Sequence, residues 1–188
     1  MTVTDTVTPA AIAPSLRRLY FVRFGFALVW AALVAAIGPQ LDALSVALFV
    51  LYPVFDVAAA VVDARSARGQ RPFAGLYVNM AISLLAGAGL ALAASSAIPG
   101  ILRVWGIWAV VSGLNQLVVA LARRGMGGQW PMIISGAIST VAGASFIVQA
   151  AGPHPSLTAL AGYAVLGGIF FLVSAIRLGR AAPATGSR

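Results

Sequence analysis

Six long apolar runs, separated by short polar or glycine- and proline-containing segments, restrict the fold of this chain most strongly. They lie near residues 19–37, 41–62, 73–94, 102–121, 131–150 and 157–176. Each holds roughly 20 residues, which is what a helix needs to cross the hydrocarbon core of a bilayer. A soluble domain carries roughly 25% charged residues, whereas this chain of 188 residues carries 9%. The sequence therefore predicts an all-α, polytopic membrane protein with six transmembrane helices.

The basic residues gather on one side of this topology. With a cytoplasmic N-terminus, every arginine except Arg103 falls on the cytoplasmic side. The arginines on that side are Arg17, Arg18, Arg23, Arg65, Arg68, Arg71, Arg123, Arg124, Arg177, Arg180 and Arg188. Such an excess is the positive-inside pattern. It predicts six spans with both termini in the cytoplasm. The first run is longer than a signal peptide's apolar segment, so we expect it to be retained.

The topology also accounts for the net charge of +8, so we expect no nucleic-acid partner. The expected partner is the lipid bilayer, with anionic headgroups as contacts of the cytoplasmic arginines. Residues 1–16 and 181–188 are polar or rich in alanine and proline, which predicts a disordered cytoplasmic N-tail and a C-tail around a membrane domain at 17–180.

An internal repeat divides the membrane region into three parts. Residues 81–89, AISLLAGAG, match residues 137–145, AISTVAGAS, at six of nine positions and at a shift of 56. A unit of two spans returns the chain to the same side of the membrane, so all copies share one orientation. The repeat predicts three parallel helical hairpins around a pseudo-threefold axis along the membrane normal.

Small residues spaced about one turn apart predict close packing of the third and fifth runs, because they let helix backbones approach. The predicted packing positions are Ser83, Gly87, Ala91, Ser139 and Gly143. Pro53 lies inside the second run, where it frees a carbonyl group and is expected to kink the helix. The tryptophans are expected mostly near span ends, as interfacial anchors.

Polar residues inside the runs lie at similar depths, about 6–9 Å from the cytoplasmic boundary at 1.5 Å per residue. This layer comprises Asp56, Arg23, Asn79, Asn115, Gln116 and Ser135. Arg23, Asn79 and Ser135 are equivalent in the repeat, as are Asp56, Ser112 and Gly168. A charged side chain within a bilayer is costly unless it is paired. We therefore expect Asp56 to face inward and pair with Arg23, with Asn79, Asn115 and Gln116 completing the network.

Three interpretations of this layer stay open. It is either a structural clasp that fixes the register of the hairpins, or a proton or small-solute site open to the cytoplasm. Arg23 could also snorkel alone to a lipid headgroup. Beyond Asn79 the same face continues through Ser83, Gly87 and Ala91, which favours a closed vestibule over a continuous path.

No constellation in the sequence indicates catalysis. The single histidine, His154, lies in a predicted outer loop, and no His/Asp/Glu cluster has the spacing of metal ligands. No serine within the predicted spans has a histidine base at its membrane level, and no phosphate-binding loop is present. Cysteine is absent, which excludes disulfides. We expect no enzymatic activity, no metal and no cofactor.

Residues 104–147 carry small, basic and aromatic residues in a recognisable order. Ser112 and Gly113 lie in one helix, Arg123 and Arg124 end it, and Trp130 opens the next after a short glycine-containing loop. This segment resembles the HdeD family of small bacterial inner-membrane proteins, as do the six spans. The resemblance implies an integral inner-membrane protein, with acid resistance as the function of the family's namesake. It brings no catalytic or ligand-binding residues with it.

Overall fold

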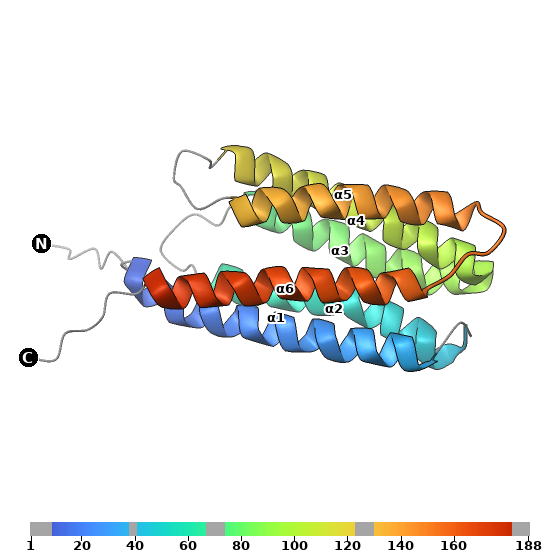
Figure 1. The fold of residues 1–188 in the computed structure, drawn as a ribbon, viewed down its shortest axis with the longest axis horizontal. Coiled ribbons are helices and arrows are strands. Elements are labelled where there is room, and N and C mark those ends of the chain that lie inside the picture. Colours follow the sequence, from blue (N-terminus) through green and yellow to red (C-terminus); the bar gives the residue numbers. More distant parts are fainter. Residues whose placement is uncertain (1–8, 38–40, 67–73, 123–129, 182–188) are drawn as a thin grey trace, which may run out of the picture.

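The computed structural model describes residues 9–37, 41–66, 74–122 and 130–181. Every element of regular secondary structure within them is a helix, so the predicted all-α fold is confirmed. The helices are α1 (Pro9–Ile37), α2 (Ala43–Ser66), α3 (Ala74–Ala93), η1 (Ala94–Ser96, a 3-10 helix), α4 (Ala97–Ala122), α5 (Trp130–Ala150) and α6 (Thr158–Ala181). The α-helices lie along one long axis, and each runs opposite to the next along the chain (Figure 1).

The described helices differ from the predicted runs mainly at the N-terminus. α1 begins at Pro9, within the segment predicted to be a disordered tail. A proline is favourable at the first position of a helix, and the alanines that follow are strong helix formers. The remaining tail residues and several arginines lie outside the described residues: 1–8, 182–188, Arg68, Arg71, Arg123, Arg124 and Arg188.

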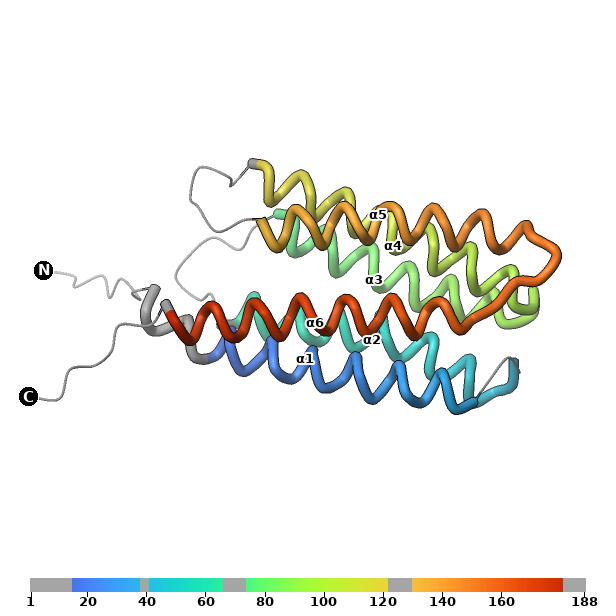
Figure 2. The backbone as a smooth tube through the Cα atoms, in the orientation of Figure 1, coloured from blue at the N-terminus to red at the C-terminus, as the bar shows by residue number. Residues whose placement is uncertain are grey.

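Five helical stretches within the described residues are long and apolar enough to cross a membrane. Four belong to α1, α2, α5 and α6, and the fifth is Ala74–Leu121, a stretch of 48 residues that contains both α3 and α4. The chain reverses within this stretch at η1 and Ala97, whose φ is 57°. α3 and α4 consequently run antiparallel (Figure 2). Length and hydropathy thus indicate a helical membrane protein.

The most extensive packing joins α4 to α5, α1 to α6 and α2 to α3. Glycines permit the closest approach, between α4 and α5: a Cβ built on Gly113 would lie 2.7 Å from the carbonyl oxygen of Gly136. On α3, Ser83 and Gly87 face inward as predicted, but Ala91 is exposed and Leu90 is buried in its place. A helix has 3.6 residues per turn, so its inward stripe drifts away from a strict four-residue spacing.

Pro53 is fully buried within α2, which remains helical through it. It packs against α3, since a Cβ built on Gly87 would lie 3.8 Å from its Cγ. The outward-facing positions are large and apolar, as a lipid-exposed surface requires. They include Leu85, Leu92, Val141 and Val148, each more than two-thirds exposed.

An aromatic cluster fills the centre of the bundle. Trp30, Trp105 and Trp108 are buried, and the first two stack with ring centroids 5.1 Å apart. The indole of Trp30 donates a 2.7 Å hydrogen bond to the carbonyl oxygen of Leu48. The expectation of interfacial anchors is therefore wrong for these three residues. Trp130, 70% exposed at the start of α5, has the exposure expected of an anchor.

Candidate functional site

Asp56 of α2 is paired with Arg23 of α1. The Nη2 group of Arg23 donates to Oδ1 of Asp56 in a salt bridge, and 17% of the arginine side chain and 13% of the aspartate side chain are exposed. The guanidinium also lies over the ring of Phe171 on α6, with Cζ 4.4 Å from the ring centroid. A cation over an aromatic face is attracted by the ring quadrupole. Arg23 therefore contacts both α2 and α6.

The second oxygen of the carboxylate is held from α3. Asp56 Oδ2 accepts hydrogen bonds from Asn79 Nδ2 at 2.7 Å and from Ser83 Oγ at 2.9 Å. Ser83 in turn accepts a 3.1 Å hydrogen bond from the indole Nε1 of Trp108 on α4. We call Arg23, Asp56, Asn79, Ser83 and Trp108 the polar clasp. It links four consecutive helices through one carboxylate.

The rest of the predicted layer lies apart from Asp56. Asn115 Nδ2 donates to the carbonyl oxygen of Gly75 at 3.1 Å, and Gln116 Nε2 donates to that of Met132 at 3.0 Å. The prediction that these two amides complete the Asp56 network is therefore wrong. Their depth is similar, but α4 turns them towards the first turns of α3 and α5. Ser135 is half-buried on α5 and makes no hydrogen bond to the clasp.

Ser83 and Trp108 are clasp members that the sequence reasoning did not identify. The sequence predicts a packing role for Ser83, and it predicts that the tryptophans, Trp108 among them, lie mostly near span ends. A signal for Ser83 exists, because it lies four residues after Asn79 and hence on the same face of α3. A carboxylate that reaches Asn79 can also reach the next turn. No comparable sequence signal identifies Trp108.

The space beside the ion pair is small. A cavity of about 10 Å³ is lined by Arg23, Phe26, Tyr52, Phe55, Asp56 and Phe171. This is about the volume that one water molecule needs. The rings of Phe26 and Phe55 stack beside it with centroids 3.7 Å apart. The arrangement can hold a charge pair inside an apolar bundle, but it leaves no room there for a larger solute.

Within the described residues, no group of three histidine, cysteine, aspartate or glutamate side chains is placed to hold a metal ion. We therefore assign no metal site. Comparison of the chain with models of protein families, with curated proteins and with solved structures finds no match.

Proposed function

We propose that this chain is a six-span protein of the bacterial inner membrane in which the polar clasp holds the helices in register, and that it acts structurally or through a partner. One observation carries the proposal: donors from α1 and α3 engage both oxygens of Asp56, beside a cavity of about 10 Å³. A paired and hydrogen-bonded carboxylate is what a charge inside a bilayer requires. A solute pathway would need open volume at the same place.

Helix length supports six spans. A continuous helix of 48 residues, the length of the Ala74–Leu121 stretch, would measure roughly 72 Å at 1.5 Å per residue. The hydrocarbon core is only about 30 Å thick. The reversal at η1 makes two crossings of suitable length from this stretch. Together with α1, α2, α5 and α6 these give the six spans, with both termini on one side.

Packing supports the pseudo-threefold arrangement. A shift of 56 residues carries the α2–α3 interface to α4–α5. A second shift carries α2 to α6, and the reverse shift of 56 carries α3 to α1, so the third copy is the α1–α6 interface. These are the three most extensive interfaces. Burial follows the same shift. The equivalent residues Val34, Leu90 and Phe146 are all buried, whereas the equivalent residues Val29, Leu85 and Val141 are all exposed.

Within this arrangement the clasp is a specialised form of a repeated contact. The pair Asp56–Ser83 is equivalent to Ser112–Ser139 and to Gly168–Ala27. The last pair is in direct contact, since a Cβ built on Gly168 would lie 3.3 Å from the Cβ of Ala27. Only the α2–α3 copy carries a carboxylate at this position. A buried polar group used once can fix the register of otherwise similar packing surfaces.

For the physiological role we propose resistance to acid stress. The support for this role is the resemblance of residues 104–147 to the HdeD family. The resemblance brings no catalytic residues. The proposed role is therefore compatible with a protein that acts by its presence in the membrane or through a partner.

Flux measurements test the structural role against its alternative, a proton or small-solute channel or carrier. Proteoliposomes with wild-type chain or Asp56→Asn are subjected to an acid jump while internal pH is recorded. We expect the internal pH to change as slowly with either protein as it does in empty liposomes. We also expect a lower unfolding temperature for the variant. Flux that wild type shows and a stably folded Asp56→Asn variant lacks would establish the transport alternative.

Topology can be tested by cysteine labelling, because the chain contains no cysteine. Single cysteines at Ser95 and His154 lie at one end of the bundle, and one at Ala74 lies at the other. In intact cells, an impermeant maleimide is expected to label the first two positions and to leave Ala74→Cys unlabelled. Labelling of Ser95→Cys and Ala74→Cys from the same side would refute two crossings in this stretch.

A further inference from the structure

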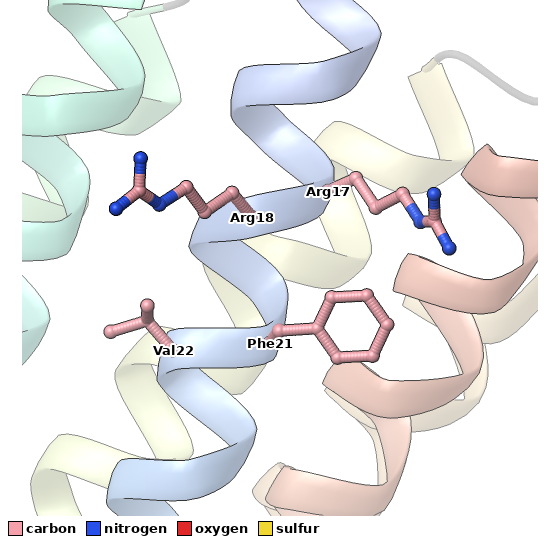
Figure 3. Close-up of a pocket in the computed structure, with 4 residues that line it drawn as sticks. All are labelled: Arg17, Arg18, Phe21 and Val22. Carbon is pink, nitrogen blue, oxygen red and sulfur yellow. The ribbon is translucent and has the colours of Figure 1, made fainter.

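The end of the bundle where α1 begins and α6 ends has an open, basic hollow on the outer surface of α1. The hollow has a volume of about 550 Å³ and is lined by Arg17, Arg18, Phe21 and Val22. The two arginines extend to opposite sides of α1, and Phe21 and Val22 lie one turn further along the helix on those same two sides (Figure 3). The lining therefore has a cationic rim and an apolar floor.

The side chain of Arg17 lies against α6. A Cβ built on Gly179 would lie 2.8 Å from the Cζ atom of Arg17 and 2.9 Å from its Nε atom. The guanidinium thus rests on the backbone of α6, in space that only a glycine leaves open. The same guanidinium lies 5.5 Å from the ring centroid of Phe21. The exposed Arg17 side chain consequently lies against both Phe21 of α1 and the backbone of α6.

The apolar floor faces outward. Phe21 is 40% exposed and Val22 is 51% exposed, and each follows an arginine by four residues. Four residues of helix correspond to about 6 Å along the axis. A bound molecule that contacts both layers must be anionic at one end and apolar about 6 Å further along the helix. None of the four lining residues is acidic.

We propose that this hollow binds a phospholipid whose anionic headgroup lies over α1 within reach of the Arg17 and Arg18 side chains, and whose acyl chains lie on Phe21 and Val22. The proposal relies on the proposed placement of the bundle in a bilayer, but it is independent of the role assigned to the polar clasp. Basic residues next to a membrane attract anionic lipids. Here the order of charges and apolar groups along α1 matches the order of phosphate and acyl chain in the lipid.

The test is lipid retention by the purified full chain in neutral detergent, followed by native mass spectrometry. Phosphatidylglycerol and phosphatidylcholine with identical acyl chains compete for the protein. We expect wild type to retain the anionic lipid preferentially, and Arg17→Gln/Arg18→Gln to lose roughly thirtyfold in relative affinity. A matched control, Arg65→Gln/Arg103→Gln, removes the same charge outside the hollow and is expected to keep the preference.

Two further variants separate a site from general electrostatics. Gly179→Ala leaves every charge in place but displaces the Arg17 guanidinium, so it is expected to reduce the preference for phosphatidylglycerol. Phe21→Ser/Val22→Ser is expected to weaken retention of long-chain lipid more than that of a short-chain analogue. Equal losses in the control pair and the Arg17/Arg18 pair would overturn the proposal. So would a bound species that inorganic phosphate alone displaces completely.

Discussion

The hydroxyl of Ser83 donates a 2.9 Å hydrogen bond to Oδ2 of Asp56 while it accepts a 3.1 Å hydrogen bond from the indole of Trp108. The indole can only donate, so it fixes the direction of the serine proton. Ser83 therefore serves as an oriented donor to a carboxylate in the interior of the bundle, where its own exposure is 0%. It also extends the Arg23–Asp56 pair to α4.

Replacing Ser83 by alanine tests this orientation. Ser83→Ala removes a donor from the carboxylate and leaves the Trp108 N–H without its acceptor. We expect it to lower the free energy of unfolding by about 1–3 kcal/mol, the typical cost of an unsatisfied buried polar group. Ser139→Ala is the matched control, because Ser139 occupies the equivalent repeat position and bonds only the neutral hydroxyl of Tyr163. Its expected cost is about 1 kcal/mol or less. Detergent unfolding curves of both variants provide the comparison.

The ion pair itself is tested by a double-mutant cycle. Asp56→Asn or Arg23→Gln leaves one charge unpaired in the apolar bundle, and each is expected to destabilise by about 3–5 kcal/mol. The double variant Arg23→Gln/Asp56→Asn contains no unpaired charge at this position. Its loss of unfolding free energy is therefore expected to be far below the sum of the losses of the two single variants. The free energy of unfolding is measured in bicelles for wild type, both single variants and the double variant. Additive losses would show that the two side chains do not stabilise each other.

Sequence reasoning could place Asp56 beside Arg23 because these are opposite charges at one depth, and neither is stable alone in an apolar medium. It could not place Asn115 and Gln116. Counting residues gives height along a helix, whereas the partner of an amide depends on the rotation of that helix against its neighbours. The same limit explains the tryptophans. Indole suits both an interface and an aromatic core, and only the packed bundle shows that Trp105 is fully buried.

Glycines of α5 and α6 predict opposite effects of the same substitution. A Cβ built on Gly143 would lie 2.7 Å from the backbone nitrogen of Val110, whereas one on Gly162 of α6 would have nothing within 4 Å. Gly143→Ala is expected to destabilise by about 1–3 kcal/mol through overpacking. Gly162→Ala is expected to stabilise by roughly 0.5–1 kcal/mol, because alanine is the better helix former. Equal effects on the unfolding midpoint would contradict the close approach of α4 and α5.

The turn between α3 and α4 has a strained residue. Ala97 has φ 57° and ψ −166°, a combination that is essentially restricted to glycine. Ala97→Gly is therefore expected to raise the free energy of unfolding by about 1 kcal/mol. The control is Ala91→Gly, an exposed position inside α3, which is expected to lower stability by a similar amount because glycine weakens helix interiors. A lower thermal midpoint for Ala97→Gly would mean that the backbone does not hold this conformation.

The N-terminus of α2 predicts a pH dependence. Asp42 accepts a 2.8 Å hydrogen bond from the backbone N–H of Ser45, whose hydroxyl accepts one from the Asp42 N–H at 2.8 Å. The hydrogen bonds from Ser45 hold the pKa of Asp42 below its ordinary value of 3.8, the backbone N–H contributing most. A carboxyl whose pKa is lowered by folding stabilises the folded state above its unfolded pKa and loses that contribution as pH falls through the folded pKa.

Asp42→Asn isolates this effect, because asparagine also caps helices but does not titrate. Thermal midpoints of both proteins are measured in detergent from about pH 6 to about pH 2, a range that brackets the pKa values of aspartate. Wild type is expected to be more stable than Asp42→Asn at the upper end, where the carboxylate is ionised. The difference is expected to shrink below the ordinary pKa and to vanish once the carboxyl is protonated in both states. A difference independent of pH would show that the charge of Asp42 does not contribute to the cap.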